Sequence, residues 1–311
     1  MKVVISARNF VFDGCGAVDL LKENGYEVVC VDKNADEAEY IAAIKKADAV
    51  INGFEPINTD MLKECSNLKL ISVRGVGYDY IDTAVCAEMG IAISRAVGTV
   101  GKAVSELAMA YMLHFARKVS CQNEAMQRGK WERIMTEGLG GKTLGIFGFG
   151  EIGQALAKKA EAFDMKVRYF CRTPKDNPDY LFSSPDEIYA NSDYIVLAIP
   201  LCEETRKMID ENALSKMKKN AVLINIARAG IVDNNALCNA VKNEIIRGAA
   251  VDVYENEPCT DSTLKGVNGI ILTPHTAPFT KQNFIDMNML AAQNVIDYFN
   301  GSIDKKYLVR G

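Results

Sequence analysis

A glycine-rich segment near the middle of the chain has the residue types and spacing of a dinucleotide-phosphate site. Gly148-Phe149-Gly150-Glu151-Ile152-Gly153 directly follows the apolar run 143–147 and precedes a helix-forming run, 154–163. In such a unit the first glycine permits a tight turn, the second lets backbone approach a pyrophosphate, and the third lets the helix pack closely on the strand. Free N–H groups at the helix N-terminus favour the anion. Glycine turns also occur without ligands, so the flanking strand and helix carry this prediction.

The residues after the next strand of this unit indicate which dinucleotide is bound. The run 166–171 ends at Cys171, 18 residues after Gly153, where an NAD site usually has an acidic residue that binds the ribose 2′-OH. This chain has Cys171-Arg172-Thr173 instead. A neutral residue followed by an arginine and a hydroxyl suits a 2′-phosphate. We therefore expect NAD(P) as cofactor with a preference for NADP(H), the alternative being an exposed Arg172 and a site that still takes NAD(H).

Alternating strand and helix patterns predict an α/β protein with two doubly wound parallel sheets. Apolar or β-branched runs predict strands at 3–6, 27–31, 49–52, 70–74 and 91–94, with helices such as 36–46 and 59–65 between them. Six further strands are expected at 143–147, 166–171, 194–199, 221–225, 248–253 and 270–272, the count of a complete dinucleotide-binding sheet. Long helical patterns cover 100–128 and 284–299.

Composition and charge narrow the class of function. The 311 residues are 49% apolar and 24% charged, as expected of a soluble globular chain with two domains. The formal net charge of −4 lacks the basic excess of a nucleic-acid binder. The sequence contains neither a signal-peptide pattern nor an apolar run of the roughly 18 residues that a transmembrane helix needs. Nine cysteines without a C-x-x-C pair suggest neither a disulfide framework nor a zinc site. We expect a cytoplasmic protein without nucleic-acid, membrane or metal partners.

Four further motifs make the chain resemble the D-isomer-specific 2-hydroxyacid dehydrogenase family. Their fixed order and spacing make the resemblance specific, and it covers nearly the whole chain. The motifs are Arg74-Gly-Val-Gly-Tyr-Asp-Tyr-Ile-Asp82, Asn225-Ile-Ala-Arg-Ala-Gly-Ile-Val-Asp233, Val251-Asp-Val-Tyr-Glu-Asn-Glu-Pro258 and Thr273-Pro-His-Thr-Ala277.

The resemblance implies an architecture and a reaction. A Rossmann cofactor domain, 99–283, would be inserted in a flavodoxin-like substrate domain made of 1–98 and 284–311. The enzyme would transfer a hydride from the nicotinamide to a small 2-oxo acid such as glyoxylate, hydroxypyruvate or pyruvate, giving the D-2-hydroxy acid. The long helix over 100–128 makes a homodimer the default expectation, although ordinary core packing explains its apolar stripe as well.

The family's catalytic arginine, glutamate and histidine fall on Arg228, Glu257 and His275. Reduction of a 2-oxo acid needs a proton donor for the developing alkoxide and a cation for the substrate carboxylate. An imidazole suits the first role because it titrates near neutrality, and a neighbouring carboxylate would orient it and favour its protonated form. Arginine suits the second because its planar fork binds carboxylates bidentately. Each residue taken singly could be structural, but together they follow three successive strands, where open α/β sheets bind ligands.

The resemblance also implies binding residues. Backbone N–H groups of Gly75-Val76-Gly77 would form an anion nest for the substrate carboxylate, together with Asn52, Gly53 and Arg228. In the family's pattern Asp252 binds the nicotinamide carboxamide and Val104 packs on its ring. The full set expected at the cofactor is Val104, Gly148, Gly150, Glu151, Ile152, Gly153, Cys171, Arg172, Thr173, Pro200, Thr205, Ala227, Arg228, Asp252, His275 and Ala277.

Three positions depart from the family's usual pattern and leave the substrate open. Cys202, Ala229 and Pro278 stand where other residues are commoner, which weakens substrate assignment by analogy. The scarcity of Arg and Lys in the segments expected to face the substrate disfavours a phosphorylated one. Two alternatives remain: a D-3-phosphoglycerate dehydrogenase without a regulatory domain, and a nucleotide-sensing, corepressor-like binding protein. The second has no need for the His and Glu together, so their presence favours an enzyme.

Overall fold

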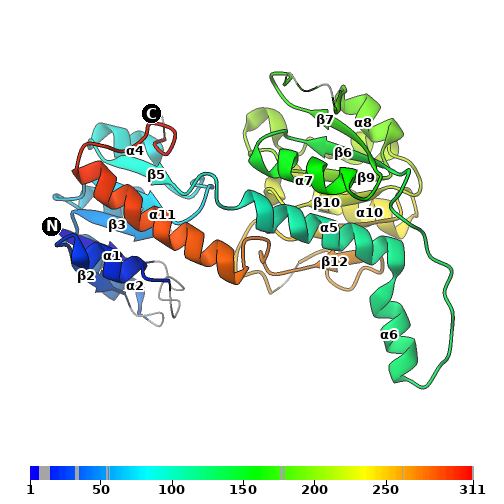
Figure 1. Ribbon diagram of the computed structural model, residues 1–311, viewed down its shortest axis with the longest axis horizontal. Helices are drawn as coiled ribbons and strands as arrows, with labels where there is room; N and C mark the ends of the chain where they lie inside the picture. Colours follow the sequence, from blue (N-terminus) through cyan, green and yellow to red (C-terminus); the bar gives the residue numbers. More distant parts are fainter. Residues whose placement is uncertain are drawn as a thin grey trace. The chain divides into compact units, whose positions relative to one another are not determined.

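The computed structural model describes residues 1–6, 15–31, 35–53, 55, 57–175, 177, 179–260 and 262–309. The chain divides into two compact units (Figure 1). Unit 1 contains Met1–Val100 and Phe279–Gly311, and unit 2 contains Gly101–Pro278. Each unit is built on one parallel sheet with helices against it, which confirms the predicted α/β class with two doubly wound sheets.

Unit 1 has a five-stranded sheet in the order β2-β1-β3-β4-β5, the flavodoxin-like order. All of its strand pairs are parallel. Its strands are β1 (Lys2–Ile5), β2 (Glu27–Cys30), β3 (Ala49–Asn52), β4 (Leu70–Val73) and β5 (Ala92–Arg95). Its helices are α1 (Ala17–Glu23), α2 (Glu37–Ile44), α3 (Thr59–Lys63), α4 (Thr83–Glu88) and α11 (Lys281–Phe299).

Alternation along the strands of unit 1 supplies two cores, one on each face of the sheet. Val3 and Ile5 of β1 pack with α1 and α11, whereas Val4 packs with α2, α3 and α4. Burial on both faces explains why these strands are almost wholly apolar. Helices α3 and α4 have side-chain N-caps, because Asn58 and Asp82 accept hydrogen bonds from the first turns of these two helices.

Unit 2 has a seven-stranded parallel sheet in the order β12-β11-β10-β9-β6-β7-β8. The six strands β8-β7-β6-β9-β10-β11 have the dinucleotide-binding order, and β12 is added beside β11. Its strands are β6 (Thr143–Phe147), β7 (Lys166–Phe170), β8 (Leu181–Phe182), β9 (Tyr194–Leu197), β10 (Val222–Asn225), β11 (Gly248–Val251) and β12 (Ile270–Leu272). Its helices are α5 (Gly101–Arg117), α6 (Val119–Gln127), α7 (Glu151–Glu161), α8 (Pro185–Asn191), α9 (Glu211–Ser215) and α10 (Asn234–Lys242).

Three features of unit 2 differ from the sequence-based expectations. The single helix expected over 100–128 is two helices, α5 and α6, separated by Lys118 in the left-handed conformation at φ 49°. The two-residue strand β8 was not expected. The strand expected over 248–253 ends at Val251, so Glu257 lies in the following loop rather than at the strand end. Within the described ranges, no helix is long and apolar enough to span a membrane.

Candidate functional site

The glycine turn between β6 and α7 has the backbone geometry of a phosphate cradle. Gly148 adopts φ 95°, and a Cβ there would lie 2.3 Å from the carbonyl oxygen of Ala198. A Cβ on Gly153 would lie 2.1 Å from the carbonyl oxygen of Gly148, so α7 approaches the turn as closely as only glycine allows. A Cβ on Gly150 would meet no atom within 4 Å. The turn therefore leaves open space at its middle glycine, beside the start of α7, which fits a dinucleotide pyrophosphate.

The start of α7 is also tied to the start of α5. Gly150 is the N-cap of α7 and supplies no side chain to its first N–H groups. Glu151, in the first turn, accepts a hydrogen bond from the backbone N–H of Gly101 at 2.8 Å. Ile152 is half-buried, and Val104 lies on the buried side of α5. The two helices that begin near the glycine turn are thus held together by a side chain of the turn's own sequence motif.

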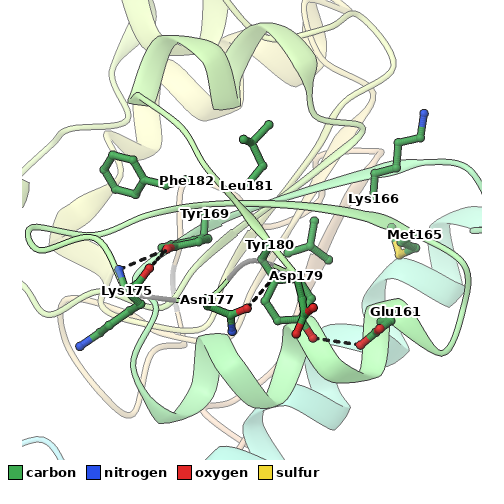
Figure 2. A pocket seen from close by; sticks show the side chains of 11 residues that line it. Glu161, Met165, Lys166, Tyr169, Lys175, Asn177, Asp179, Tyr180, Leu181 and Phe182 are labelled. Atoms are coloured by element: carbon green, nitrogen blue, oxygen red, sulfur yellow. Dashed lines mark hydrogen bonds between the residues drawn. The ribbon is translucent and has the colours of Figure 1, made fainter.

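A groove lies beside β7. Its volume is about 570 Å³, and Figure 2 shows Tyr169, Tyr180 and Phe182 among the side chains that line it. Tyr169 stacks on Phe149 of the glycine turn with ring centroids 3.9 Å apart. None of the predicted site residues lines this groove. It is therefore separate from the predicted chemistry.

Two loops follow the strands on either side of β6, and they contain the residues expected near the adenosine. After β7, Cys171 is partly buried, whereas Arg172 and Thr173 are exposed. After β9, Thr205 donates a hydrogen bond to the carbonyl oxygen of Pro200 at 2.8 Å. The hydrogen bond with Cys202 and, more weakly, the charge of Arg172 lower the pKa of the exposed Glu204. Arg172 therefore lies within electrostatic reach of the second loop.

The loop after β10 is shaped by Asn225, a buried residue that the sequence analysis did not single out. Its amide donates to the carbonyl oxygen of Arg228 at 2.9 Å and its carbonyl accepts from the N–H of Ala227 at 3.1 Å. Arg228 is half-buried, and its guanidinium donates to the carbonyl oxygen of Ala227 at 2.8 Å. An asparagine at the last position of a buried strand is the signal that could have identified this role, because its side chain can close a turn by binding nearby backbone.

His275 and Glu257 form a hydrogen-bonded pair. Nδ1 of His275 lies 2.7 Å from a carboxylate oxygen of Glu257. Burial raises the pKa of Glu257, but the hydrogen bond and charge of His275, the backbone N–H of Tyr254 and the charge of Arg228 outweigh burial, so the pKa is lowered. The carboxylate is thus ionised at neutral pH and can only accept, which makes Nδ1 the donor. Nε2 is left to carry the exchangeable proton, and Arg228 is near enough to influence the pair.

Asp252 is wholly buried directly after β11 and organises the loop that contains His275. Its carboxylate accepts hydrogen bonds from the Thr273 hydroxyl at 2.5 Å and from the N–H groups of Thr276 and Ala277 at 2.8 and 2.9 Å. Burial raises the pKa of Asp252, and these hydrogen bonds offset the effect only in part. Each oxygen of this carboxylate is already bound to the chain, and four lone-pair positions leave room for a further donor.

The predicted substrate-binding residues of unit 1 follow two adjacent strands, β3 and β4. Asn52 is wholly buried, and its carbonyl oxygen accepts from the N–H of Arg74 at 2.8 Å. Gly53 accepts a hydrogen bond from the Tyr80 hydroxyl. The half-buried segment 75–77 begins directly after Arg74, and Gly75 accepts from the N–H of Ala96 at 2.8 Å. Unit 1 thus brings these two loops together, as unit 2 does for Arg228, Glu257 and His275.

The described residues contain no cluster of three or more His, Cys, Asp or Glu side chains that could hold a metal ion. The donors described above at the carboxyl edge of the unit 2 sheet are backbone N–H groups, the guanidinium groups of Arg172 and Arg228, and the imidazole of His275. Such a set suits an anionic organic ligand rather than a metal.

The sheet order and glycine turn of unit 2 define a dinucleotide-binding domain of the Rossmann class, and comparison with known proteins identifies its family. The family model described as "D-isomer specific 2-hydroxyacid dehydrogenase, NAD binding domain" matches residues 109–277. A glyoxylate reductase of Thermococcus litoralis is 35% identical over 274 residues, covering 84% of this chain and 83% of that protein. The chain therefore belongs to the D-isomer-specific 2-hydroxyacid dehydrogenase family. This membership confirms the predicted class of enzyme, an NAD(P)-dependent oxidoreductase that acts on CH–OH groups.

Two solved structures extend the similarity over the whole chain. An acyclic imino acid reductase in complex with NADPH and D-Arg has a TM-score of 0.89, 27% identity, and full coverage of both chains. An NAD-dependent formate dehydrogenase of Staphylococcus aureus in complex with NAD has a TM-score of 0.89 and 26% identity, covering 100% of this chain and 99% of that chain. A nicotinamide cofactor is thus common to these relatives, which differ in whether it carries the 2′-phosphate.

Proposed function

We propose that this protein reduces small 2-oxo acids of the glyoxylate, hydroxypyruvate or pyruvate type to D-2-hydroxy acids. The observation that carries the proposal is the pairing of His275 with an ionised Glu257 beside Arg228, after successive strands of a dinucleotide-binding sheet. The similarity to a glyoxylate reductase supports the same substrate class.

In this mechanism the protein's side chains bind the substrate, orient the imidazole and donate the proton. The guanidinium of Arg228 binds the substrate carboxylate and polarises the adjacent carbonyl. Nε2 of His275 gives its proton to the carbonyl oxygen as negative charge develops there, and Glu257 holds the ring through Nδ1 and stabilises the cation. When bound, the nicotinamide would supply a hydride, so the oxo acid gains two electrons and one proton as that hydride and a second proton from His275. The proton on His275 is then replaced from solvent.

The two units would divide the work of binding. Unit 2 has nearly the same bounds as the proposed cofactor domain, 99–283. It would hold the dinucleotide through the glycine turn, with the pyrophosphate at the start of α7 and the carboxamide at Asp252. Unit 1 has nearly the same bounds as the proposed substrate domain, 1–98 with 284–311. It would offer the backbone N–H groups of 75–77 to the substrate carboxylate. Asn52 ends the neighbouring strand β3, and its backbone carbonyl accepts from the N–H of Arg74, directly before this loop. Gly53 follows Asn52.

We propose a preference for NADP(H), carried by Arg172. Arg172 is exposed directly beyond β7, where a 2′-phosphate would be read, and Thr173 adds a hydroxyl. Glu204 opposes this preference, because its carboxylate lies within electrostatic reach of Arg172 and would repel a phosphate. Arg172→Gln is expected to raise the KM for NADPH about tenfold with little effect on NADH. Glu204→Gln is the opposite test, because it removes the charge that would repel the phosphate, and it should lower the KM for NADPH.

The experiment that tests the function is oxidation of NADPH and NADH, followed by absorbance, with a panel of 2-oxo acids. The panel contains glyoxylate, hydroxypyruvate, pyruvate, 2-oxobutyrate and phosphohydroxypyruvate. Oxidation with a small unphosphorylated acid is the expected result. A clear preference for phosphohydroxypyruvate would instead indicate a phosphoglycerate dehydrogenase. Tight cofactor binding without turnover of any acid would indicate a nucleotide-sensing binding protein.

We further propose that the enzyme is a cytoplasmic homodimer. The segment from α6 to the start of β6 carries four exposed large apolar side chains, Val119, Met126, Trp131 and Met135, with Trp131 77% and Met135 92% exposed. No residue of α6 is buried. A second copy of the chain would cover this surface. A dimeric mass by light scattering that becomes monomeric in Trp131→Ser supports the proposal, and a monomeric wild type overturns it. All nine cysteines are free thiols, which suits the reducing cytoplasm.

A further inference from the structure

A chain of hydrogen bonds runs from the long helix α5 to the loop that contains His275. Tyr111, on the buried side of α5, is hydrogen-bonded through its hydroxyl to the Thr273 hydroxyl. Thr273 in turn donates to a carboxylate oxygen of Asp252 at 2.5 Å. The same carboxylate accepts the N–H groups of Thr276 and Ala277. Tyr111 is thus connected through Thr273 to Asp252, which binds the backbone N–H groups directly after His275.

The backbone of His275 needs such support. His275 adopts φ 50°, in the left-handed region that favours glycine. A non-glycine residue held there costs on the order of 1 kcal/mol or more, and it persists only where the surroundings determine the conformation. The two N–H groups directly after His275 are those bound by Asp252. Two residues before it, the carbonyl oxygen of Thr273 accepts from the Tyr254 hydroxyl at 2.9 Å. The conformation of His275 therefore depends on groups outside its own loop.

The chemistry of the donors fixes the direction of the chain. An ionised carboxylate only accepts hydrogen bonds, so the Thr273 hydroxyl donates its hydrogen bond to Asp252. The Thr273 oxygen can then only accept a hydrogen bond from Tyr111. The Tyr111 hydroxyl is therefore the first donor in this series of hydrogen bonds. Burial raises the pKa of Tyr111, so this proton is kept at neutral pH. Consecutive hydrogen bonds polarise one another in a buried site, so losing the first donor weakens the bond to Asp252.

We propose that Tyr111 is a positioning residue for His275, acting through Thr273 and Asp252. The inference rests on the proposed function, in which His275 donates the proton to the substrate. Tyr111 sets how firmly Asp252 holds the loop 273–277, and hence how often the imidazole has the geometry for proton transfer. A displacement of about 1 Å at a reacting group is enough to lower a rate about 100-fold. Loss of one outer donor is expected to have a smaller effect.

Steady-state kinetics of Tyr111→Phe, Thr273→Val, the double variant and Thr273→Ser test this role. Tyr111→Phe should lower kcat for glyoxylate about tenfold and leave the KM values of substrate and cofactor within about twofold. The double variant should be no slower than Thr273→Val alone, because both changes break the same chain. Thr273→Ser keeps the hydroxyl and should retain most of the activity. Tyr180→Phe is the matched control, because it also loses one tyrosine hydrogen bond, to Glu161, beside the β7 groove.

The outcomes separate the inference from the proposed function. A kcat of Tyr111→Phe equal to that of wild type and Tyr180→Phe would overturn the inference, as would losses that multiply in the double variant. A lower melting temperature with unchanged kcat would show a merely structural role and overturn it too. The proposed function fails differently, through a wild type that reduces no 2-oxo acid or a His275→Gln variant that keeps full activity.

Discussion

Two buried aspartates at opposite edges of the unit 2 sheet have opposite electrostatics. Asp193 precedes β9 at the amino edge and Asp252 follows β11 at the carboxyl edge. Burial raises the pKa of Asp193, but the N–H of Thr143, the Lys218 ammonium and the Asn220 amide outweigh it, so the pKa is lowered. Burial also raises the pKa of Asp252, and there the hydrogen bonds do not outweigh it.

The difference lies in the kind of donor rather than in the number of donors, since each carboxylate accepts three hydrogen bonds from the described residues. Asp193 has a full positive charge among its donors, whereas those of Asp252 are a hydroxyl and two backbone N–H groups. The amino edge is therefore arranged for stability. The carboxyl edge retains a poorly compensated charge, as expected where a protein keeps polar groups for a ligand.

Among the variants that test this comparison, Asp252→Asn should have the largest effect, and it should separate activity from stability. The raised pKa means that the ionised form is disfavoured in the folded state, so removing the charge should change the free energy of unfolding by no more than about 1 kcal/mol. The new amide would face N–H groups and could no longer hold the loop of His275. We expect kcat/KM to fall about 100-fold. A large loss of stability in urea unfolding would break the comparison with Asp193.

The glycine turn offers a second contrast within the carboxyl edge. Gly153→Ala forces a Cβ against the carbonyl oxygen of Gly148 and should destabilise the protein by about 2 kcal/mol. Gly150→Ala projects its Cβ into open space, so it should leave the melting temperature within about 2 °C of wild type. It should nevertheless raise the KM of the cofactor about tenfold, because the methyl occupies the phosphate position. Equal effects of the two variants on stability would contradict the assignment of that space.

Asp193→Asn should give the smallest effect, and one on stability alone. Removing the charge weakens the bonds to Lys218 and Thr143 and should cost about 1 to 2 kcal/mol at pH 7. Since the folded pKa is lowered, this contribution is present above the unfolded pKa of about 3.9 and is lost as the pH falls through the folded value. Urea unfolding should therefore show the two proteins converging below about pH 4, with kcat unchanged at neutral pH. A difference that persists in acid would refute the electrostatic explanation.

The sequence predicts the sheets well because their strands are short apolar runs, and the helices between them begin at recognisable N-caps. It predicts less well where a feature has no local signal. Nothing in Ala116-Arg117-Lys118-Val119 marks the helix break at Lys118, since the stretch contains neither glycine nor proline. The strand β8 is only two residues long, too short for any periodicity to appear.

The same limit applies to the site. The glycine turn, Arg228, Glu257 and His275 stand in motifs, so their types and spacing are enough to predict them as site residues. Tyr111 is an ordinary apolar position of a long helix in the sequence, and its contact with Thr273 spans 162 residues. Such long-range contacts exist only once the sheet is assembled. The positive φ of His275 is likewise set by surrounding elements, not by its own residue type.

The most direct test of the account is the kcat/KM of His275→Gln for glyoxylate, measured beside wild type with cofactor binding and folding verified in both. General acid catalysis by a positioned side chain contributes about 10²- to 10⁴-fold. We predict a loss in that range with cofactor affinity nearly unchanged, because the proposed role of the pair with Glu257 is proton transfer. A variant that binds the cofactor and reduces glyoxylate at the wild-type rate would contradict it.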